Sequence, residues 1–323
     1  MGAVFEGKGK GKKMSIPSNI LFWIFVIPGT VALGLFASWI VRKVSAKVQY
    51  RVGPPLLQPL YDVMKLMGKE ILMPQEAQQT VFIMAPLVGL AGILLLSIML
   101  WRISFAQTAF LGDIIVAIYL MTLPSLALIL GSSASASPHA AVGTAREMKL
   151  VMGYELSLVL AFIVVIIKTG GQISLAAIAE YTPALSISGM LAFVVALLCV
   201  QAKLGFVPFD IAEAETELGS GVLMEYSGAL LAVWKLAQAV MLVGLPLFLV
   251  MVFLGGFGTT GLSLVWGIGK YVLILVLLIL IKNTNPRLRI DQAMKFFWFY
   301  CGITLVIAII LAMIGYYSGI SWL

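Results

Sequence analysis

Eight runs of mostly apolar residues divide the chain, and shorter polar segments separate them. A helix that crosses a bilayer needs roughly 20 such residues, and each run approaches or exceeds that length. The runs cover residues 20–41, 80–100, 111–131, 149–168, 186–202, 225–251, 265–282 and 295–317. The pattern predicts an all-α integral membrane protein with about eight transmembrane helices.

The segment before the first run is polar and rich in glycine and lysine. We expect residues 1–18 to form a flexible N-terminal arm and residues 19–323 to form a single polytopic membrane domain. The first run is long and lacks a small-residue cleavage pattern, so it does not indicate a removable signal peptide. Met1 and Met14 are both candidate translation starts.

Composition agrees with a membrane protein. Hydrophobic residues make up 61% of the chain and charged residues only 11%, whereas soluble domains carry about 25% charged residues. The net charge of +7 does not indicate nucleic-acid binding, because most lysines and arginines lie in short connections between apolar runs. The expected environment is a lipid bilayer.

The basic residues also predict an orientation, because cytoplasmic connections carry the excess of lysine and arginine. The connections after odd-numbered runs hold Arg42, Lys43, Lys47, Arg51, Lys65, Lys69, Arg146, Lys149, Lys203, Lys282, Arg287, Arg289 and Lys295. The opposite side holds Lys8, Lys10, Lys12, Lys13, Arg102, Lys168 and Lys270. We therefore expect a multi-pass protein of the cell membrane with both termini outside. The four lysines before Met14 oppose this orientation unless translation starts there.

A further helical pattern lies in the first connection, residues 42–79. Leu57, Leu60, Tyr61 and Met64 recur at helical spacing, and charged residues occupy the other side. This predicts an amphipathic helix in the first cytoplasmic loop. Two interpretations stay open, because such a helix can lie at the membrane interface or pack on a partner protein.

Acidic residues gather between the fifth and sixth runs, on the predicted cytoplasmic side. The stretch FVPFDIAEAETELGSGVLMEYSG contains Asp210, Glu213, Glu215, Glu217 and Glu225, five of the fourteen acidic residues in the chain. On a helix, Asp210, Glu213 and Glu217 would share one face, and Glu215 would point elsewhere.

This acidic stretch has two interpretations. It can be a solvated loop, or it can be a proton site, because carboxylates crowded in a low dielectric exchange protons near neutral pH. The expected cation partners come from other cytoplasmic connections, namely Arg51, Arg146, Arg287 or Arg289.

Three ionisable residues extend the pattern toward the membrane interior. Glu155 lies inside the fourth run, where a charge is costly and indicates either function or a paired structural carboxylate. Glu147 lies one or two turns closer to the cytoplasm. Lys235 lies about 15 Å into the sixth run by helical rise, which predicts a buried partner such as a carboxylate. Together with the acidic stretch, they indicate a polar track from the cytoplasmic face toward the midplane.

Metal and cofactor chemistry is not expected in this chain. Cys199 and Cys301 both fall in apolar runs and are predicted to be small buried hydrophobes. The sequence has no CxxC motif, no Cys/His cluster and no phosphate-binding glycine loop. The lone His139, in a polar loop segment, is predicted to be solvated. We therefore assign no catalytic residue, metal ligand or cofactor site to the chain.

Four stretches of the chain together resemble subunit 1 of respiratory complex I and its relatives. These relatives are the membrane anchor subunits of energy-converting membrane-bound NiFe hydrogenases and related membrane-bound sulfur reductases. The stretches are VQYRVGPPLLQPLYDVMKLMGKE (48–70), GTAREMKLVMGYE (143–155), PFDIAEAETELGSGVLMEYSG (208–228) and NPRLRIDQAMKFFW (285–298). Their order and the eight-run layout also match, so the resemblance covers roughly residues 15–315.

Two details indicate the branch of the family. The first-loop motif is the short RVGPPLLQP, residues 51–59, which is similar to the hydrogenase branch. Gln238 stands where complex I members usually keep a glutamate, which puts in doubt a carboxylate relay along the sixth helix. Lys235 can take that place in another arrangement.

The resemblance implies a role for each matched position. Coupling of redox chemistry to proton or ion movement is implied for Glu155, Asp210, Glu213, Glu215, Glu217 and Glu225, to which we add Glu147 and Lys235 from the residues themselves. Redox-arm docking or a quinone-like cavity is implied for Arg51, Gly53, Pro54, Pro55, Arg287, Arg289 and Asp291, with Arg146 beside them. The expected partners are hydrogenase-like large and small subunits, an iron–sulfur subunit and antiporter-like membrane subunits. Iron–sulfur clusters and a NiFe-type site are expected in these partners.

Three functions stay open on this basis. The leading hypothesis is a non-catalytic membrane subunit that couples a peripheral redox arm to proton or sodium translocation. A stand-alone proton- or cation-coupled transporter and a purely structural anchor are the alternatives. A quinone-binding complex I subunit is a further possibility within the same family.

Overall fold

The computed structural model describes residues 16–106, 112–259, 261–320 and 322–323, and these residues form helices and connections without a β-strand. The helices in chain order are α1 (Ile16–Val48), α2 (Gln58–Met67), α3 (Gln79–Ala106), α4 (Asp113–Ser133), α5 (Pro138–Lys168), α6 (Leu175–Ile178), η1 (Pro183–Leu185), α7 (Ile187–Lys203), α8 (Glu215–Leu218), η2 (Gly221–Leu223), α9 (Gly228–Phe253), α10 (Gly261–Thr284), α11 (Ile290–Lys295), η3 (Phe296–Cys301) and α12 (Gly302–Ser318).

Seven helices of the described chain are long and apolar enough to cross a membrane. They are α1, α3, α4, α5, α9, α10 and the continuous stretch from α11 through η3 to α12. An eighth span results if α7 is counted together with the α6–η1 segment, from which it is bent by 106°. The prediction of an all-α membrane protein with about eight spans is therefore confirmed.

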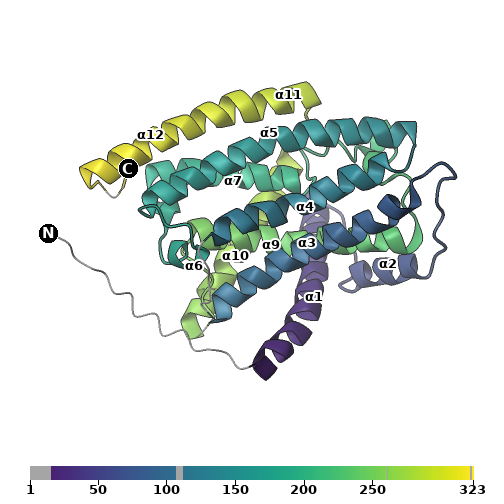
Figure 1. Ribbon diagram of the computed structural model, residues 1–323, viewed down its shortest axis with the longest axis horizontal. Helices are drawn as coiled ribbons and strands as arrows, with labels where there is room; N and C mark the ends of the chain where they lie inside the picture. The colour runs from purple at the N-terminus through teal and green to yellow at the C-terminus, as the bar shows by residue number, and fades with distance from the viewer. Residues whose placement is uncertain (1–15, 107–111, 260, 321) are drawn as a thin grey trace.

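The central element of the bundle is α9. From Ala239 onward its sequence is apolar on all sides and its side chains are buried, which is typical of a helix surrounded by others. It packs against α1, α2, α3, α7 and α10. In Figure 1, α3, α4, α5, α7 and α12 run roughly along the longest axis, α1 crosses this direction steeply, and α12 forms an outer layer over α5.

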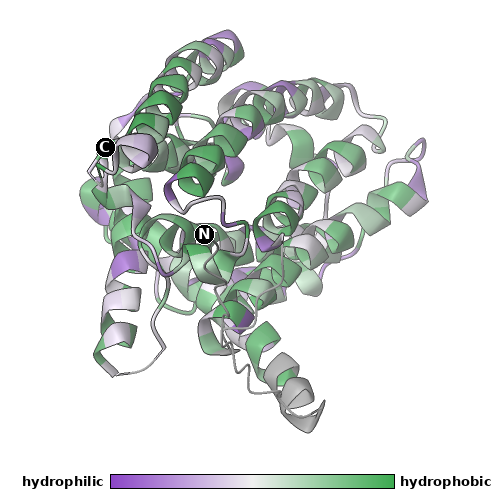
Figure 2. Cartoon of the chain, turned by 60° about the vertical axis from the view of Figure 1, so that its left-hand side comes forward, coloured by the Kyte–Doolittle hydropathy of each residue, from purple (hydrophilic) through white to green (hydrophobic). Residues whose placement is uncertain are grey.

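Apolar side chains cover most of the helical surface. In Figure 2 the helices are mainly green, and the hydrophilic residues gather at helix ends and connections. This distribution is expected when lipid, not water, surrounds the middle of each helix.

A close backbone approach fixes α1 against α9. A Cβ atom on Gly34 would lie 2.6 Å from the carbonyl oxygen of Ala239. Small residues at such crossings allow helices in a membrane to approach closely, because packing supplies most of their attraction. Gly34 therefore determines the separation of α1 from the central helix.

Several predicted boundaries change in the structure. The predicted arm falls mostly on residues 1–15, which lie outside the described residues. The helix α5 begins at Pro138, eleven residues before the predicted run, so Glu147 lies within it. The helix α9 begins at Gly228, so Glu225 precedes it. The polar stretch before α5 is shorter than predicted because α4 continues to Ser133.

The crossing at Gly34 yields a test of the packing. We expect Gly34→Val to lower the free energy of unfolding by about 1–3 kcal/mol, because the added side chain overpacks the contact with α9. The thermal midpoint of the detergent-solubilised protein measures this loss. Gly29→Val is the matched control on the same helix, because a Cβ atom there meets nothing within 4 Å. Equal midpoints for the two variants would contradict the proposed contact.

Candidate functional site

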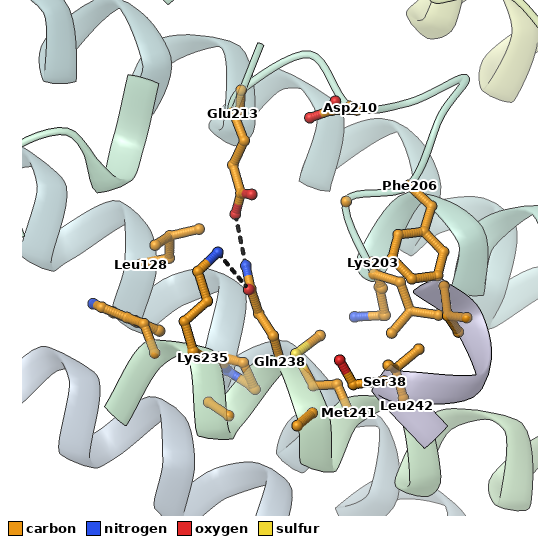
Figure 3. A pocket seen from close by; sticks show the side chains of 18 of the residues that line it. Ser38, Leu128, Lys203, Phe206, Asp210, Glu213, Lys235, Gln238, Met241 and Leu242 are labelled. Atoms are coloured by element: carbon orange, nitrogen blue, oxygen red, sulfur yellow. Dashed lines mark hydrogen bonds between the residues drawn. The ribbon is translucent and has the colours of Figure 1, made fainter. Parts of the chain in front are cut away.

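A cavity of about 730 Å³ lies where α1, α2 and α9 meet the connection between α7 and α9. We call this connection, residues 204–227, the acidic loop. Its charged lining residues are Arg42, Asp62, Lys65, Lys69, Glu147, Lys203, Asp210, Glu213, Lys235, Lys282 and Arg287. Seven of these are basic and four are acidic. Apolar side chains such as Phe206 and Leu242 complete the wall (Figure 3).

The acidic loop does not form the predicted helix. Within this loop only Glu215–Leu218 is α-helical and Gly221–Leu223 forms a short 3-10 turn, so Asp210, Glu213 and Glu217 do not share a helical face. The prediction is wrong because Pro208 and the glycines at 219 and 221 restrict regular structure to these two short turns. The side chain of Glu215 lies outside the described part.

The carboxylates of the acidic loop instead reach three different partners. Asp210 pairs with Arg287, at 2.8 Å between carboxylate oxygen and guanidinium nitrogen. Glu217 pairs with Arg146 at 2.8 Å. These two pairs confirm two of the four expected cation partners. They tie the acidic loop to α5 and to the connection between α10 and α11.

The third carboxylate, Glu213, joins a hydrogen-bonded chain across the cavity (Figure 3). The Nζ of Lys235 donates to Oε1 of Gln238 at 3.2 Å, and Nε2 of Gln238 donates to Oε1 of Glu213 at 2.9 Å. An ammonium only donates and a carboxylate only accepts, so the amide has one favourable orientation between them. The direct partner of Lys235 is thus an amide, and the expected carboxylate partner is wrong, because Gln238 stands between the two charges.

Backbone and aromatic contacts hold the acidic loop in place. The side chain of Phe209 is 2% exposed and packs on Phe297, with 4.8 Å between ring centroids. The amide of Leu288 donates to the carbonyl of Pro208 at 3.0 Å. On α5, a Cβ atom at Gly143 would lie 2.8 Å from the amide nitrogen of Val222. The loop is therefore a fixed part of the bundle.

Glu155 has a partner that the sequence does not indicate. It forms an ion pair with Lys203, whose side chain is fully buried. In the sequence Lys203 is only one of the basic residues of the connections, because it follows an apolar run. Its proximity to Gly205 and to the acidic stretch gives no local signal of burial. The pairing depends on the packing of α7 against α5.

Glu147 lines the same cavity from α5. It lies within electrostatic range of both Glu213 and Lys203. The structure therefore gathers Glu147, Asp210, Glu213 and Lys235 around one cavity. Glu155, Glu217 and Glu225 are not among the described residues that line it, and a polar track toward the midplane stays a prediction.

The first-loop residues lie beside this site. The carbonyl of Pro54 accepts a hydrogen bond from Nε1 of Trp39 at 3.3 Å, and Gly53 has a positive φ of 72° that suits glycine. Arg51 is exposed. Neither Arg51 nor the Gly53–Pro55 turn is among the described residues that line the cavity.

The residues predicted in the connection before the last span occupy α11. Arg289 is the N-terminal cap residue of this helix, and Asp291 lies in its first turn. Glu225 is partly buried just before α9. The roles assigned to these three residues stay predictions.

A helix is present at the predicted place in the first loop, and it is α2. Its side chains Pro59 and Val63 are buried, while Leu60, Tyr61 and Met64 are exposed. Asp62 bridges to Arg42 of α1 at 2.7 Å. Burial by itself would raise the pKa of Asp62, but hydrogen bonds from Arg42 and Gln58, together with the positive charges of Arg42 and Lys65, outweigh it and hold the pKa below its usual value. A location of α2 at a membrane interface stays a prediction.

The long apolar helices around a charged cavity define a multi-pass membrane protein. The family model described as NADH dehydrogenase matches residues 20–313. The chain therefore belongs to this family, which includes membrane subunits of NADH-quinone oxidoreductases.

Several relatives extend this similarity. An NADH-quinone oxidoreductase subunit from Dehalococcoides mccartyi is 30% identical, over 87% of this chain and 82% of its own length. The corresponding protein from Syntrophotalea carbinolica is 33% identical, over 86% of this chain and 90% of its own length. The fold is similar to a chain in the structure of the membrane-bound sulfane sulfur reductase, an archaeal respiratory membrane complex. That match has a TM-score of 0.83 and 26% identity, over 91% of this chain and 99% of the other.

The aromatic contact under the acidic loop yields a second test. We expect Phe209→Ala to cost about 3–5 kcal/mol at this contact, since it empties a buried aromatic site. The acidic loop should then detach, and its amide hydrogens should exchange faster while the long helices keep their protection. Hydrogen–deuterium exchange mass spectrometry of residues 206–228 measures this change.

The control for this test is Phe299→Ala. Phe299 lies on η3 close to Phe297 but is 62% exposed, so exchange in the acidic loop should not change. Equal exchange in the Phe209 variant and the unaltered protein would show that other contacts hold the loop.

Proposed function

We propose that this chain is the non-catalytic membrane subunit of a multisubunit redox complex that translocates protons or sodium ions. It anchors a peripheral arm of hydrogenase-like large and small subunits and an iron–sulfur subunit, and it adjoins antiporter-like membrane subunits. The names of the relatives support a redox complex, because they are subunits of NADH-quinone oxidoreductases or parts of a sulfane sulfur reductase complex.

The observation that supports the coupling role is that the acidic loop is attached to three different elements. Arg146 on α5, Arg287 after α10 and Gln238 on α9 each hold a different carboxylate of the loop. A movement of the loop as a whole would therefore alter contacts with all three elements. This links the surface of the bundle to its interior without a mobile domain.

Electrostatics gives such a link its strength. The interaction of two charges rises as the effective dielectric falls, and it is several times stronger near or inside a protein than in bulk water. Reduction of a group in a docked partner adds negative charge, which raises the proton affinity of nearby carboxylates. Glu147 and Glu213 line the cavity and lie within electrostatic range of each other, so they can respond together.

Electron transfer is assigned to the partners in this proposal. Iron–sulfur clusters and a NiFe-type site in the peripheral arm would supply the redox chemistry. This chain contributes the carboxylates and cations that respond to it. The orientation is part of the proposal, with the acidic loop on the cytoplasmic side and both termini outside.

Quinone binding in the cavity is a second candidate, and the cavity size favours it. A volume of about 730 Å³ is within the range of small-molecule sites, and charged and apolar residues share the lining. The names of the sequence relatives include quinone. Mass spectrometry of an organic extract from the purified complex decides this point, since stoichiometric quinone would favour it and its absence would favour the hydrogenase-like branch.

The coupling role is tested with Glu213→Gln and Glu155→Gln in the whole complex. We expect the complex to assemble and to transfer electrons to an artificial acceptor, because both side chains keep their shape. Ion transport by the complex in proteoliposomes should fall on the order of 100-fold for a carboxyl that carries the proton directly. A pH-sensitive dye and a sodium-flux assay measure it.

Glu180→Gln is the control for these variants. Glu180 is exposed and lies beyond the C-terminal end of α5, so ion transport should match the unaltered complex. Full ion transport in both test variants would overturn the relay role. Transport by the isolated chain would favour the stand-alone transporter instead.

A further inference from the structure

Lys203 is the most deeply buried charge of the candidate site. Its side chain has no exposed surface. Its ammonium pairs with Glu155 of α5 and donates to the backbone carbonyl of Met121 on α4 at 3.2 Å. It also lies 5.0 Å from the ring centroid of Tyr154, within range of a cation–π contact. One ammonium thus joins three helices.

A purely structural explanation accounts poorly for this pair. Desolvation of two charges costs several kcal/mol per ion, and replacing a buried ion pair by apolar residues is often neutral or stabilising. Lys203 is the last residue of α7 and follows the buried apolar residues of this helix. A methionine would fill this place without the desolvation cost, so the charge itself needs an explanation.

The position of Lys203 between the cavity and Glu155 explains why a charge is present there. Among the described residues, the lining of the cavity includes Lys203 and Glu147 but not Glu155. Lys203 therefore contacts the cavity and reaches beyond it to Glu155, which is 18% exposed. Its ammonium interacts electrostatically with both carboxylates of α5. The two carboxylates are eight residues apart, about 12 Å along the helix.

We infer that Lys203 is a coupling residue that transmits a change of charge in the cavity to Glu155. This inference rests on the proposed function and adds a residue to it. When Glu147 is charged, it shares the attraction of the ammonium with Glu155. When the charge of Glu147 changes, directly or in response to Glu213, the forces on the ammonium change, and its attraction to Glu155 changes with them. The burial of Lys203 makes this response strong, since water does not screen it.

This route differs from the hydrogen-bonded chain on the other side of the cavity. There the neutral amide of Gln238 separates Lys235 from Glu213. At Lys203 the ammonium contacts the carboxylate directly. Charge in the cavity therefore acts on a membrane-embedded carboxylate through Lys203, and the Gln238 chain mainly holds the acidic loop.

The test uses Lys203→Met in the whole complex, and it has two readouts. Without the ammonium, the carboxylate of Glu155 is left without its partner, and such a group neutralises by binding a proton. Infrared spectroscopy should show a new protonated-carboxyl band, which should be absent from the unaltered complex and from the Lys203→Met/Glu155→Gln double variant. Ion transport should fall at least about tenfold while electron transfer to an artificial acceptor continues.

Two further variants make the outcome decisive. Lys203→Arg keeps the charge and should keep more transport than Lys203→Met. Lys270→Met is the matched control, because Lys270 is a partly buried lysine of α10 that donates to the backbone carbonyl of Leu254. It should give neither the new band nor the loss of transport.

The results separate this inference from the proposed function. Loss of transport in Glu155→Gln but not in Lys203→Met, without a new band, overturns the role of Lys203 alone. Full transport in both Glu155→Gln and Glu213→Gln overturns the proposed function as well. If Lys203→Met does not assemble, Lys203→Gln decides, because it keeps a polar side chain but removes the charge. A new protonated-carboxyl band with reduced transport in this variant supports the inference. Full transport without the new band overturns it, and failure to assemble shows that Lys203 serves the fold and overturns it as well.

Discussion

A charge inside an apolar helical bundle needs a partner of opposite sign, and the arrangement of this site depends on that constraint. Glu155 has its partner on α7 and Asp210 has its partner in the connection after α10. Glu217, whose side chain is 61% exposed, pairs with Arg146 of α5 at the surface. Each pair joins segments that are far apart in the chain. The pairs therefore do more than neutralise charge, because they decide where the irregular acidic loop lies against the regular helices.

The rigid part of the protein makes this arrangement possible. The helix α9 is surrounded by its neighbours, and Gly34 brings α1 into backbone contact with it. Such packing has few alternative arrangements, since interiors are close-packed. The acidic loop, which carries the candidate chemistry, is anchored on this frame by Phe209 and by its ion pairs. A rigid frame that positions an irregular functional segment is a common division of roles in proteins.

The cavity combines charged side chains, which respond to a change of charge, with a volume and an apolar wall that suit a small molecule. Its basic side chains outnumber its acidic ones, so an added negative charge would be attracted to it. Two lysines of the cavity, Lys235 and Lys203, differ in how they contact the nearby carboxylates. Lys235 acts through the amide of Gln238, whereas Lys203 contacts Glu155 directly. The acids lie in the stretches that carry the family resemblance, and the cations around them differ in how directly they contact those acids.

The sequence by itself determined the fold class, the approximate membrane spans, the family and the position of the acidic stretch between two apolar runs. A membrane helix satisfies its own backbone hydrogen bonds, so its signal is local and can be read from apolar runs. The sequence did not determine the shape of the acidic loop, the amide partner of Lys235 or the burial of Lys203. Each of these depends on which helices become neighbours, and side chains distant in the chain compete for the same partner. Only the tertiary structure decides that competition, because burial and pairing are properties of the packed bundle.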